Sequence, residues 1–291
     1  MRGDKRTQTG FTLIELIIVV VITGIISVVV GMFIKTPVDQ YIDIARRAEM
    51  TEVADTALRR MGRDIRTAVP NSVRLSGISF IEFLPTKTGG RYRANSSGGN
   101  LCALIANNAD GDTLSFTLAD SCFEIVGPAI TFAAGDFIVV GSTQANGNPP
   151  YDQTAAGILR AYNSVAGGVG SKAIVVMTAT LLPSFSSLQS QRFSVVSAYQ
   201  QAVTYACQNL GIVNGEGSGT LRRYWRYGFN AAQVAPPIGG SSALLADNVS
   251  ACSIVYNTVN QRNGLVAILL TITQGGESIS LYQEIHVNNA P

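Results

Sequence analysis

The sequence predicts an α+β fold, in which a long N-terminal α-helix packs on a large antiparallel β-rich globular region. Three observations support this prediction: an unbroken apolar run over residues 11–34, helical spacing of apolar side chains over residues 38–66, and short β-prone runs from Val73 onward. The apolar run predicts that the first half of the helix lies in the membrane. The helical spacing of apolar residues predicts that the second half is amphipathic.

The composition fits a chain that has part of its length in lipid. Hydrophobic residues make up 46% of the 291 residues and charged residues only 14%, against roughly 25% in an ordinary soluble protein. The formal net charge of +2 indicates no polyanionic partner, so we expect no nucleic-acid binding. The single histidine, His286, excludes most histidine-based catalysis and metal binding, and no nucleophile or paired-carboxylate motif is present. We therefore expect a protein that is not an enzyme and has no cofactor.

The apolar run is long enough to cross a membrane. It has roughly 24 residues, which in a helix at about 1.5 Å each spans the hydrocarbon core. Arg2, Lys5 and Arg6 precede it and should hold the N-terminus in the cytoplasm, which places the remainder outside the inner membrane. An ordinary secretory signal has a shorter apolar region that ends at a small-residue cleavage site, and neither feature is found here.

A carboxylate near the start of this apolar run requires an explanation, because a charge in lipid is costly. Residues 10–15 read GFTLIE, with Glu15 among leucine and isoleucine. This segment resembles the prepilin motif of type IV pilins and type II secretion pseudopilins. The spacing of Gly10, Phe11 and Glu15 before an uninterrupted apolar run makes the signal specific.

The resemblance implies how the N-terminus is processed and used. A prepilin peptidase would cut after Gly10 on the cytoplasmic side, and the new terminus at Phe11 would be N-methylated. Glu15 would meet the N-terminal amine of a neighbouring subunit and set the register of assembly, which is a charge pairing in a low-dielectric bundle. Residues 1–10 would then be a cytoplasmic leader, and residues 11–35 a transmembrane and assembly helix.

Residues 36–69 are predicted to continue this helix as an amphipathic segment that packs on the globular domain. Its arginines are balanced by nearby acidic residues, which favours a solvated face over a nucleic-acid face. The apolar stripe consists of Tyr41, Ala45, Ala48, Ala54, Ala57, Leu58, Met61 and Ile65.

Residues 70–291 are predicted to form a periplasmic β-rich globular domain. Gly-, Asn- and Pro-rich stretches separate the β-prone runs, as in antiparallel all-β structures. A division into two β subdomains near residues 183–190 is the alternative to one domain. The runs cover residues 78–84, 113–118, 136–141, 173–179, 192–196, 202–207, 265–273 and 278–287.

All four cysteines lie in this predicted periplasmic region, where disulfides are expected. Four cysteines allow three connectivities. We favour Cys102–Cys122 with Cys207–Cys252, because each pair then lies within one half of the β region. A zinc site is disfavoured because the sequence has no C-x-x-C pair and no histidine near the cysteines.

Two segments carry weaker ligand-binding signals. Residues 107–112 loosely resemble a calcium loop with oxygen donors at Asn107, Asp110 and Asp112, although a hairpin turn explains them as well and we assign no metal. Residues 221–229 interleave arginine with aromatic residues, which suits sugar binding or a strand with one buried aromatic face. The residues of this candidate ligand surface are Arg223, Tyr224, Trp225 and Arg226.

Blocks along the whole chain resemble the large minor pilins of the mannose-sensitive haemagglutinin (MSHA) pilus system. They cover residues 43–74, 81–93, 221–229, 249–253 and 281–291. The resemblance implies a minor pilin that initiates pilus assembly and surface attachment, with other minor and major pilins as partners. It would reside in the inner membrane as a single-pass protein and later in the pilus. The alternatives are a type II secretion minor pseudopilin and a tip adhesin that binds a surface glycan.

Overall fold

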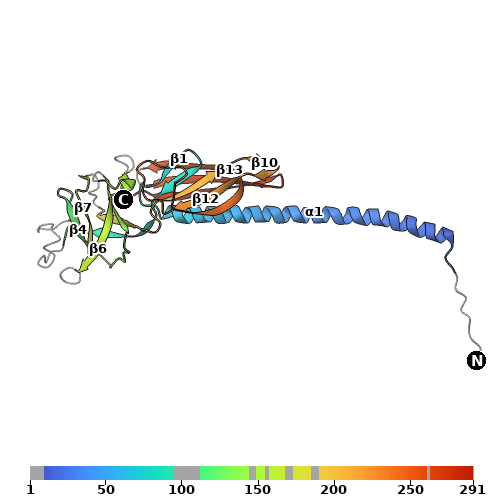
Figure 1. Ribbon diagram of the computed structural model, residues 1–291, viewed down its shortest axis with the longest axis horizontal. Coiled ribbons are helices and arrows are strands. Elements are labelled where there is room, and N and C mark those ends of the chain that lie inside the picture. The colour runs from blue at the N-terminus through green and yellow to red at the C-terminus, as the bar shows by residue number, and fades with distance from the viewer. Residues whose placement is uncertain are drawn as a thin grey trace, which may run out of the picture. The chain divides into compact units, whose positions relative to one another are not determined.

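The computed structural model has the predicted α+β arrangement, with one long helix, α1 (Leu13–Arg66), followed by antiparallel strands (Figure 1). The chain forms two compact units, Met1–Glu49 and Met50–Pro291. The leader before Gly10 and the predicted site residues Cys102, Asn107 and Asp110 lie outside the described residues. The structure describes residues 10–94, 112–143, 149–154, 157–167, 173–184, 190–260 and 263–290.

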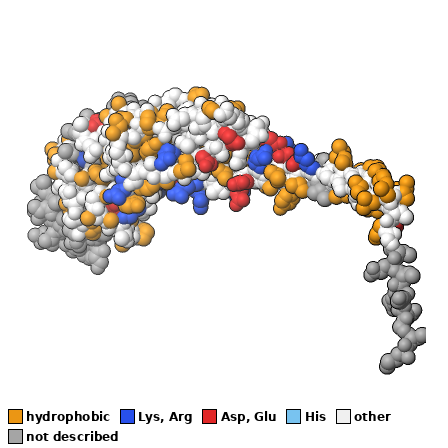
Figure 2. Space-filling model, turned by 45° about the vertical axis from the view of Figure 1, so that its right-hand side comes forward, with side chains coloured by type: hydrophobic (Ala, Val, Ile, Leu, Met, Phe, Trp, Pro, Cys, Tyr) orange, Lys and Arg blue, Asp and Glu red, His pale blue; other side chains and the backbone are white. Residues whose placement is uncertain are grey.

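The first unit contains the apolar part of α1, whose side chains are exposed. Phe11 is 82% exposed, and a window of 18 residues with a mean hydropathy of 3.0 has none of its surface buried. Figure 2 shows hydrophobic side chains crowded along this part of the helix. Thr23 and Ser27 donate their hydroxyls to helix carbonyls at 2.6 and 2.7 Å, so neither leaves an unpaired donor on the apolar surface.

In the second unit, the C-terminal part of α1 packs on a β-sheet. Five members of the predicted apolar stripe are buried there: Ala54, Ala57, Leu58, Met61 and Ile65. They contact sheet residues such as Val266 and Ile285 within one hydrophobic core. The helix ends at Arg66, short of the predicted residue 69, because Ala68 already pairs with Pro85 in an isolated β-bridge.

The sheet has seven strands, and every pair of neighbours is antiparallel. Its strands in spatial order are β1 (Arg74–Ser76), β2 (Phe80–Phe83), β9 (Val203–Gln208), β12 (Gly219–Trp225), β13 (Ser241–Asn260), β14 (Asn263–Gln274) and β15 (Glu277–Asn288). Two short strands, β10 (Ile212–Val213) and β11 (Glu216–Gly217), form a separate ribbon. Burial alternates along β14, as expected for a sheet with one face on a core.

The remaining strands close into a six-stranded barrel with its own core. Phe123 and Phe193 meet edge to face there, with ring centroids 5.1 Å apart. A short 3₁₀ helix, η2 (Pro149–Tyr151), lies in the sequence between the barrel strands at residues 137–140 and 159–167. The barrel strands in spatial order are β3 (Thr86–Tyr92), β4 (Asp120–Val126), β7 (Ala173–Thr180), β6 (Leu159–Gly167), β5 (Phe137–Val140) and β8 (Arg192–Val196).

The barrel is an insertion into the sheet. All six barrel strands come between β2 and β9 in the sequence, and β2 and β9 are hydrogen-bonded neighbours. In Figure 1, β4, β6 and β7 lie together, apart from β12 and β13. The predicted subdomain boundary at residues 183–190 falls between β7 and β8, whereas the chain returns to the sheet at Val203.

Candidate functional site

The N-terminal motif is fully accessible in the first unit. Gly10 and Phe11 are exposed, and a side chain built at Gly10 would meet no neighbouring atom. Phe11 directly precedes Thr12, and α1 begins at Leu13. Nothing among the described residues of the first unit therefore blocks access of a processing enzyme to the bond between Gly10 and Phe11.

Thr12 is the N-cap of α1, and Glu15 lies in the first turn of the helix that it caps. The backbone N–H of Glu15 donates to the carbonyl of Thr12 at 3.1 Å and lies 3.4 Å from its hydroxyl oxygen. Threonine followed three residues later by glutamate is the sequence pattern of a capping box. A carboxylate in the first turn also interacts favourably with the helix dipole. Glu15 thus lies in the first turn of its own helix, at the position that a capping box requires, as the T-x-x-E spacing indicates.

The accessible motif leads directly into a helix that is long and apolar enough to cross a membrane. A family model for the prokaryotic N-terminal methylation motif matches residues 5–31, which cover both features. The motif and the helix support a type IV pilin-like protein. Comparisons with curated proteins and with solved structures gave no match.

The pilin-type motif has three general consequences for this pilin-like protein. It implies a prepilin peptidase and other pilins as partners. It points to a structural protein rather than an enzyme. The N-terminal apolar helix is consistent with a single membrane anchor that leaves the rest of the chain on one side, as in pilins.

The predicted ligand residues of β12 do not form one surface, because their side chains lie in different surroundings. Arg223 is buried, and its Nε donates to Asp64 Oδ2 on α1 at 2.8 Å. Its guanidinium also lies 5.1 Å from the centre of the Trp225 ring, which packs against the core of the sheet. Tyr224 donates its hydroxyl to the side chain of Gln208 at 2.8 Å. The structure therefore brings Arg223 and Trp225 together on the inner side of the sheet, where they stabilise the packing of α1.

Arg226 follows β12 and contacts a different aromatic residue. It has a positive φ of 61°, and its guanidinium lies 5.1 Å from the centre of the Tyr199 ring. Tyr199 is exposed. Of the four predicted ligand residues, Arg226 is thus the one whose cation–aromatic pair reaches solvent.

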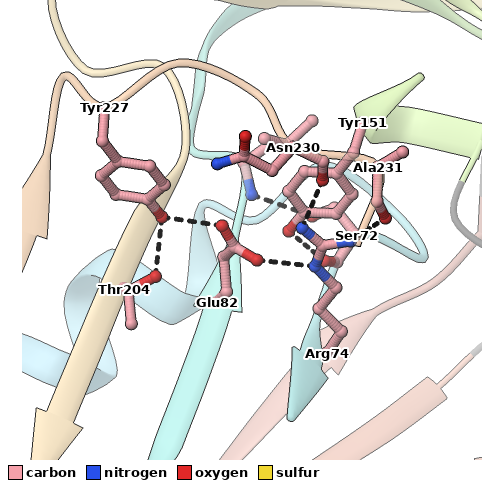
Figure 3. Close-up of polar contacts among 9 residues, drawn as sticks. Ser72, Arg74, Glu82, Tyr151, Thr204, Tyr227, Asn230 and Ala231 are labelled. Atoms are coloured by element: carbon pink, nitrogen blue, oxygen red, sulfur yellow. Dashed lines mark hydrogen bonds and ion pairs between the residues drawn. The ribbon is translucent and has the colours of Figure 1, made fainter. Parts of the chain in front are cut away.

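A buried ion pair joins β1 to β2. Arg74 Nε donates to Glu82 Oε2 at 2.6 Å, and the other two nitrogens of the guanidinium donate to the carbonyls of Ala231 and Asn230 at 2.7 Å each (Figure 3). The guanidinium lies over the ring of Tyr151, 3.6 Å from its centre. Every nitrogen of Arg74 therefore has a partner, as buried charges require.

The second oxygen of Glu82 is also paired. Tyr227 donates its hydroxyl to Glu82 Oε1 at 2.8 Å and lies 2.6 Å from the Thr204 hydroxyl, while Tyr151 donates to the carbonyl of Ser72 at 2.6 Å (Figure 3). Burial raises the pKa of Glu82, against the opposing effect of Arg74. Because these polar groups are mutually satisfied and Tyr151 comes from η2, we interpret the network as a structural junction between barrel and sheet.

One predicted disulfide is present among the described residues. Cys207 on β9 and Cys252 on β13 are bonded, with Cα atoms 6.3 Å apart. Cys122 on β4 also takes part in a disulfide. Its predicted partner, Cys102, lies outside the described residues, so that pairing stays a prediction.

Of the predicted calcium donors, Asp112 lies among the described residues, and Asn107 and Asp110 do not. This side chain is buried, and burial together with the charge of Asp120 raises the pKa of its carboxyl to about 6. Within the described ranges, no group of three or more His, Cys, Asp or Glu side chains is placed to hold a metal ion. We derive no metal site from this carboxylate.

Proposed function

We propose that this protein is a minor pilin of an MSHA-like type IV pilus, resembling the subunit MshO, that supports the initiation of pilus assembly and surface attachment. The observation that carries the proposal is the methylation motif at residues 5–31, which continues into an exposed apolar helix. The resemblance of several sequence blocks to MSHA minor pilins favours this system. The large inserted barrel favours a minor subunit, because it adds bulk that a densely repeated major subunit would have to accommodate at every position.

The proposed mechanism has no chemical step on the part of this chain. A prepilin peptidase cuts after Gly10, and Phe11 becomes the methylated N-terminus. The subunit stays in the inner membrane through residues 11–35, with residues 70–291 in the periplasm. Assembly then transfers the apolar helix from lipid into a bundle of similar helices, where packing and polar contacts replace lipid contacts. Glu15 pairs with the N-terminal amine of a neighbour and sets the register.

A pilus preparation tests this proposal directly. Sheared pili from cells that express the wild-type chain should contain it at low abundance, and deletion of its gene should reduce the number of pili and surface attachment. A Gly10→Glu variant, which blocks the peptidase, is the control and should remain in the membrane fraction. Neighbouring genes for secretion components, with normal piliation in the deletion strain, would instead indicate a type II secretion minor pseudopilin.

A further inference from the structure

A concave pocket of about 720 Å³ lies where the end of α1, the barrel and the C-terminal end of β15 meet. Arg66, Arg91 and Arg192 line it, from α1, β3 and β8 respectively. All three arginines are exposed, and the lining residues that the structure describes include no carboxylate. A volume of this size is typical of small-molecule sites. The pocket thus combines the shape of a ligand site with a positive lining.

Two of these arginines face each other directly. Arg91 on β3 and Arg192 on β8 are partners in the antiparallel register of the barrel. Like charges at such positions destabilise a sheet. No ion pair joins either arginine to a described acidic residue. A bound anion would remove this repulsion, so the fold itself favours an anionic occupant here.

Polar side chains also line the pocket. Ser142, in the segment after β5, is only 3% exposed, and its Oγ is enclosed by the protein, so we assign this hydroxyl no contact with a ligand. Thr86 and Asn288 add further hydrogen-bonding side chains to the lining.

These features together specify the ligand chemistry. Guanidinium groups bind carboxylates and sulfates through two parallel hydrogen bonds, and hydroxyl and amide side chains bind sugar hydroxyls. An acidic protein surface would need a larger and flatter contact area than a pocket of this volume provides. We propose that the pocket binds an acidic saccharide unit, with its anionic group on Arg91 and Arg192 and its sugar hydroxyls on Thr86 and Asn288.

This site is separate from the N-terminal motif, which is the observation that carries the proposed function. It does not involve the N-terminal motif, Glu15, or the arginine and aromatic residues of β12. The saccharide site and the pilin assignment can therefore hold or fail independently.

Calorimetry on the full chain in non-ionic detergent tests the proposal, with digalacturonate as the probe. The neutral disaccharide digalactose is the matched ligand, since it has a related sugar skeleton and no carboxylates. We expect saturable binding of digalacturonate that weakens as salt is added, and no binding of digalactose. No binding of digalacturonate, or equal binding of both sugars, would overturn the proposal. Tighter binding of a tetra-aspartate peptide would also overturn it, in favour of an acidic protein partner.

Paired variants locate the binding. Arg91→Gln with Arg192→Gln should lower the affinity for digalacturonate at least tenfold, while Arg60→Gln with Arg63→Gln should change it less than twofold. The second pair changes the net charge equally on exposed helix positions outside the pocket. An equal loss in both double variants would show that the binding depends on bulk charge alone.

Chemical mapping provides a readout that needs no variant. Phenylglyoxal modifies accessible arginines, and mass spectrometry of the wild-type chain reports the extent at each one. Digalacturonate should protect Arg91 and Arg192 and leave Arg60 and Arg63 unprotected. Equal modification of Arg91 and Arg192 with and without the sugar would contradict the proposed site.

Discussion

Arg223 of β12 and Asp64 of α1 form an ion pair in which the arginine side chain is only 6% exposed and the two atoms lie 2.8 Å apart. Tyr205 of β9 donates its hydroxyl to the same carboxylate oxygen at 2.7 Å. Burial and the negative charge of Asp64 raise the pKa of Tyr205, so it remains a neutral donor. A single carboxylate therefore holds the last turns of the helix against two strands of the sheet.

Asp64→Ala should destabilise the second unit strongly, because it leaves Arg223 buried without its counter-ion. Loss of one partner from a buried pair typically costs about 3–5 kcal/mol, and partial exposure of Asp64 places the expected cost at about 3 kcal/mol. Chemical denaturation measures the free energy of unfolding. Asp55→Ala is the control, since Asp55 forms an exposed pair with Arg59 on the same helix. Similar, small effects of both changes would contradict the role assigned to Asp64.

The disulfide between β9 and β13 should contribute to stability mainly by constraining the unfolded chain. Cys207 and Cys252 are separated by 45 residues, and closing a loop of that length contributes about 4 kcal/mol in the chain-entropy model. The double variant Cys207→Ser with Cys252→Ser should lose roughly that much free energy of unfolding. Reduction of the wild-type chain should cost more than this, because it also breaks the disulfide that includes Cys122. A double variant as stable as the oxidised wild type would refute the estimate.

Asp112 should make stability depend on pH in a specific window. Burial and the charge of Asp120 raise the pKa of Asp112 from 3.8 to about 6, so the folded state holds this proton more tightly than the unfolded state. The contribution of Asp112 to stability therefore decreases as the pH rises from about 4 to about 6, by on the order of 2 kcal/mol.

Asp112→Asn removes this titration. The difference in unfolding free energy between the variant and the wild type, measured by denaturation from pH 4 to pH 7, should shift in favour of the variant as the pH rises. A difference that stays constant across this range would mean that Asp112 has an ordinary pKa.

Two variants of Glu15 separate its proposed role in the register of assembly from a role in helix capping. Glu15→Ala should leave cleavage after Gly10 intact and reduce incorporation into pili, because both the carboxylate and the capping side chain are lost. Glu15→Gln retains a side chain suited to the capping box but has no charge. If the charge sets register, Glu15→Gln should be as defective as Glu15→Ala. Immunoblots of sheared pili and membrane fractions measure both steps, and normal incorporation of Glu15→Gln would assign the residue to helix capping alone.

The helix was predictable from the sequence because its signals are local. The apolar run is long and unbroken, and the apolar residues from Ala54 to Ile65 recur with helical spacing. Both features are found in α1. The strand predicted at residues 278–287 was found as β15 (Glu277–Asn288) for a similar reason, since its residues alternate regularly.

Other strands were not predicted because they contain polar residues that are uncommon in strands. β4 begins with Asp120 and contains Glu124, and both are polar residues that are buried in the structure. β13 extends from Ser241 to Asn260 and includes Asp and Asn, which are depleted in strands. The predicted strand at residues 113–118 was wrong: this segment is irregular, and the side chain of Asp120 accepts a hydrogen bond from the backbone of Ser115.

Contacts between distant parts of the chain were beyond the reach of sequence patterns. Closure of the barrel depends on β3 pairing with β8, and Arg91 faces Arg192 only because of that pairing. The inward position of Arg223 likewise depends on Asp64, which comes from a helix far away in the sequence. The pocket proposed to bind an acidic sugar could thus be recognised only in three dimensions.

The barrel leaves and rejoins the sheet at two strands, β2 and β9, that are already hydrogen-bonded to each other. The seven-stranded sheet and the helix packed on it therefore form a platform whose strand pairing does not require the barrel. The two parts can therefore evolve separately. The platform can keep its fit to neighbouring subunits while the inserted barrel is enlarged, exchanged or adapted to new surfaces.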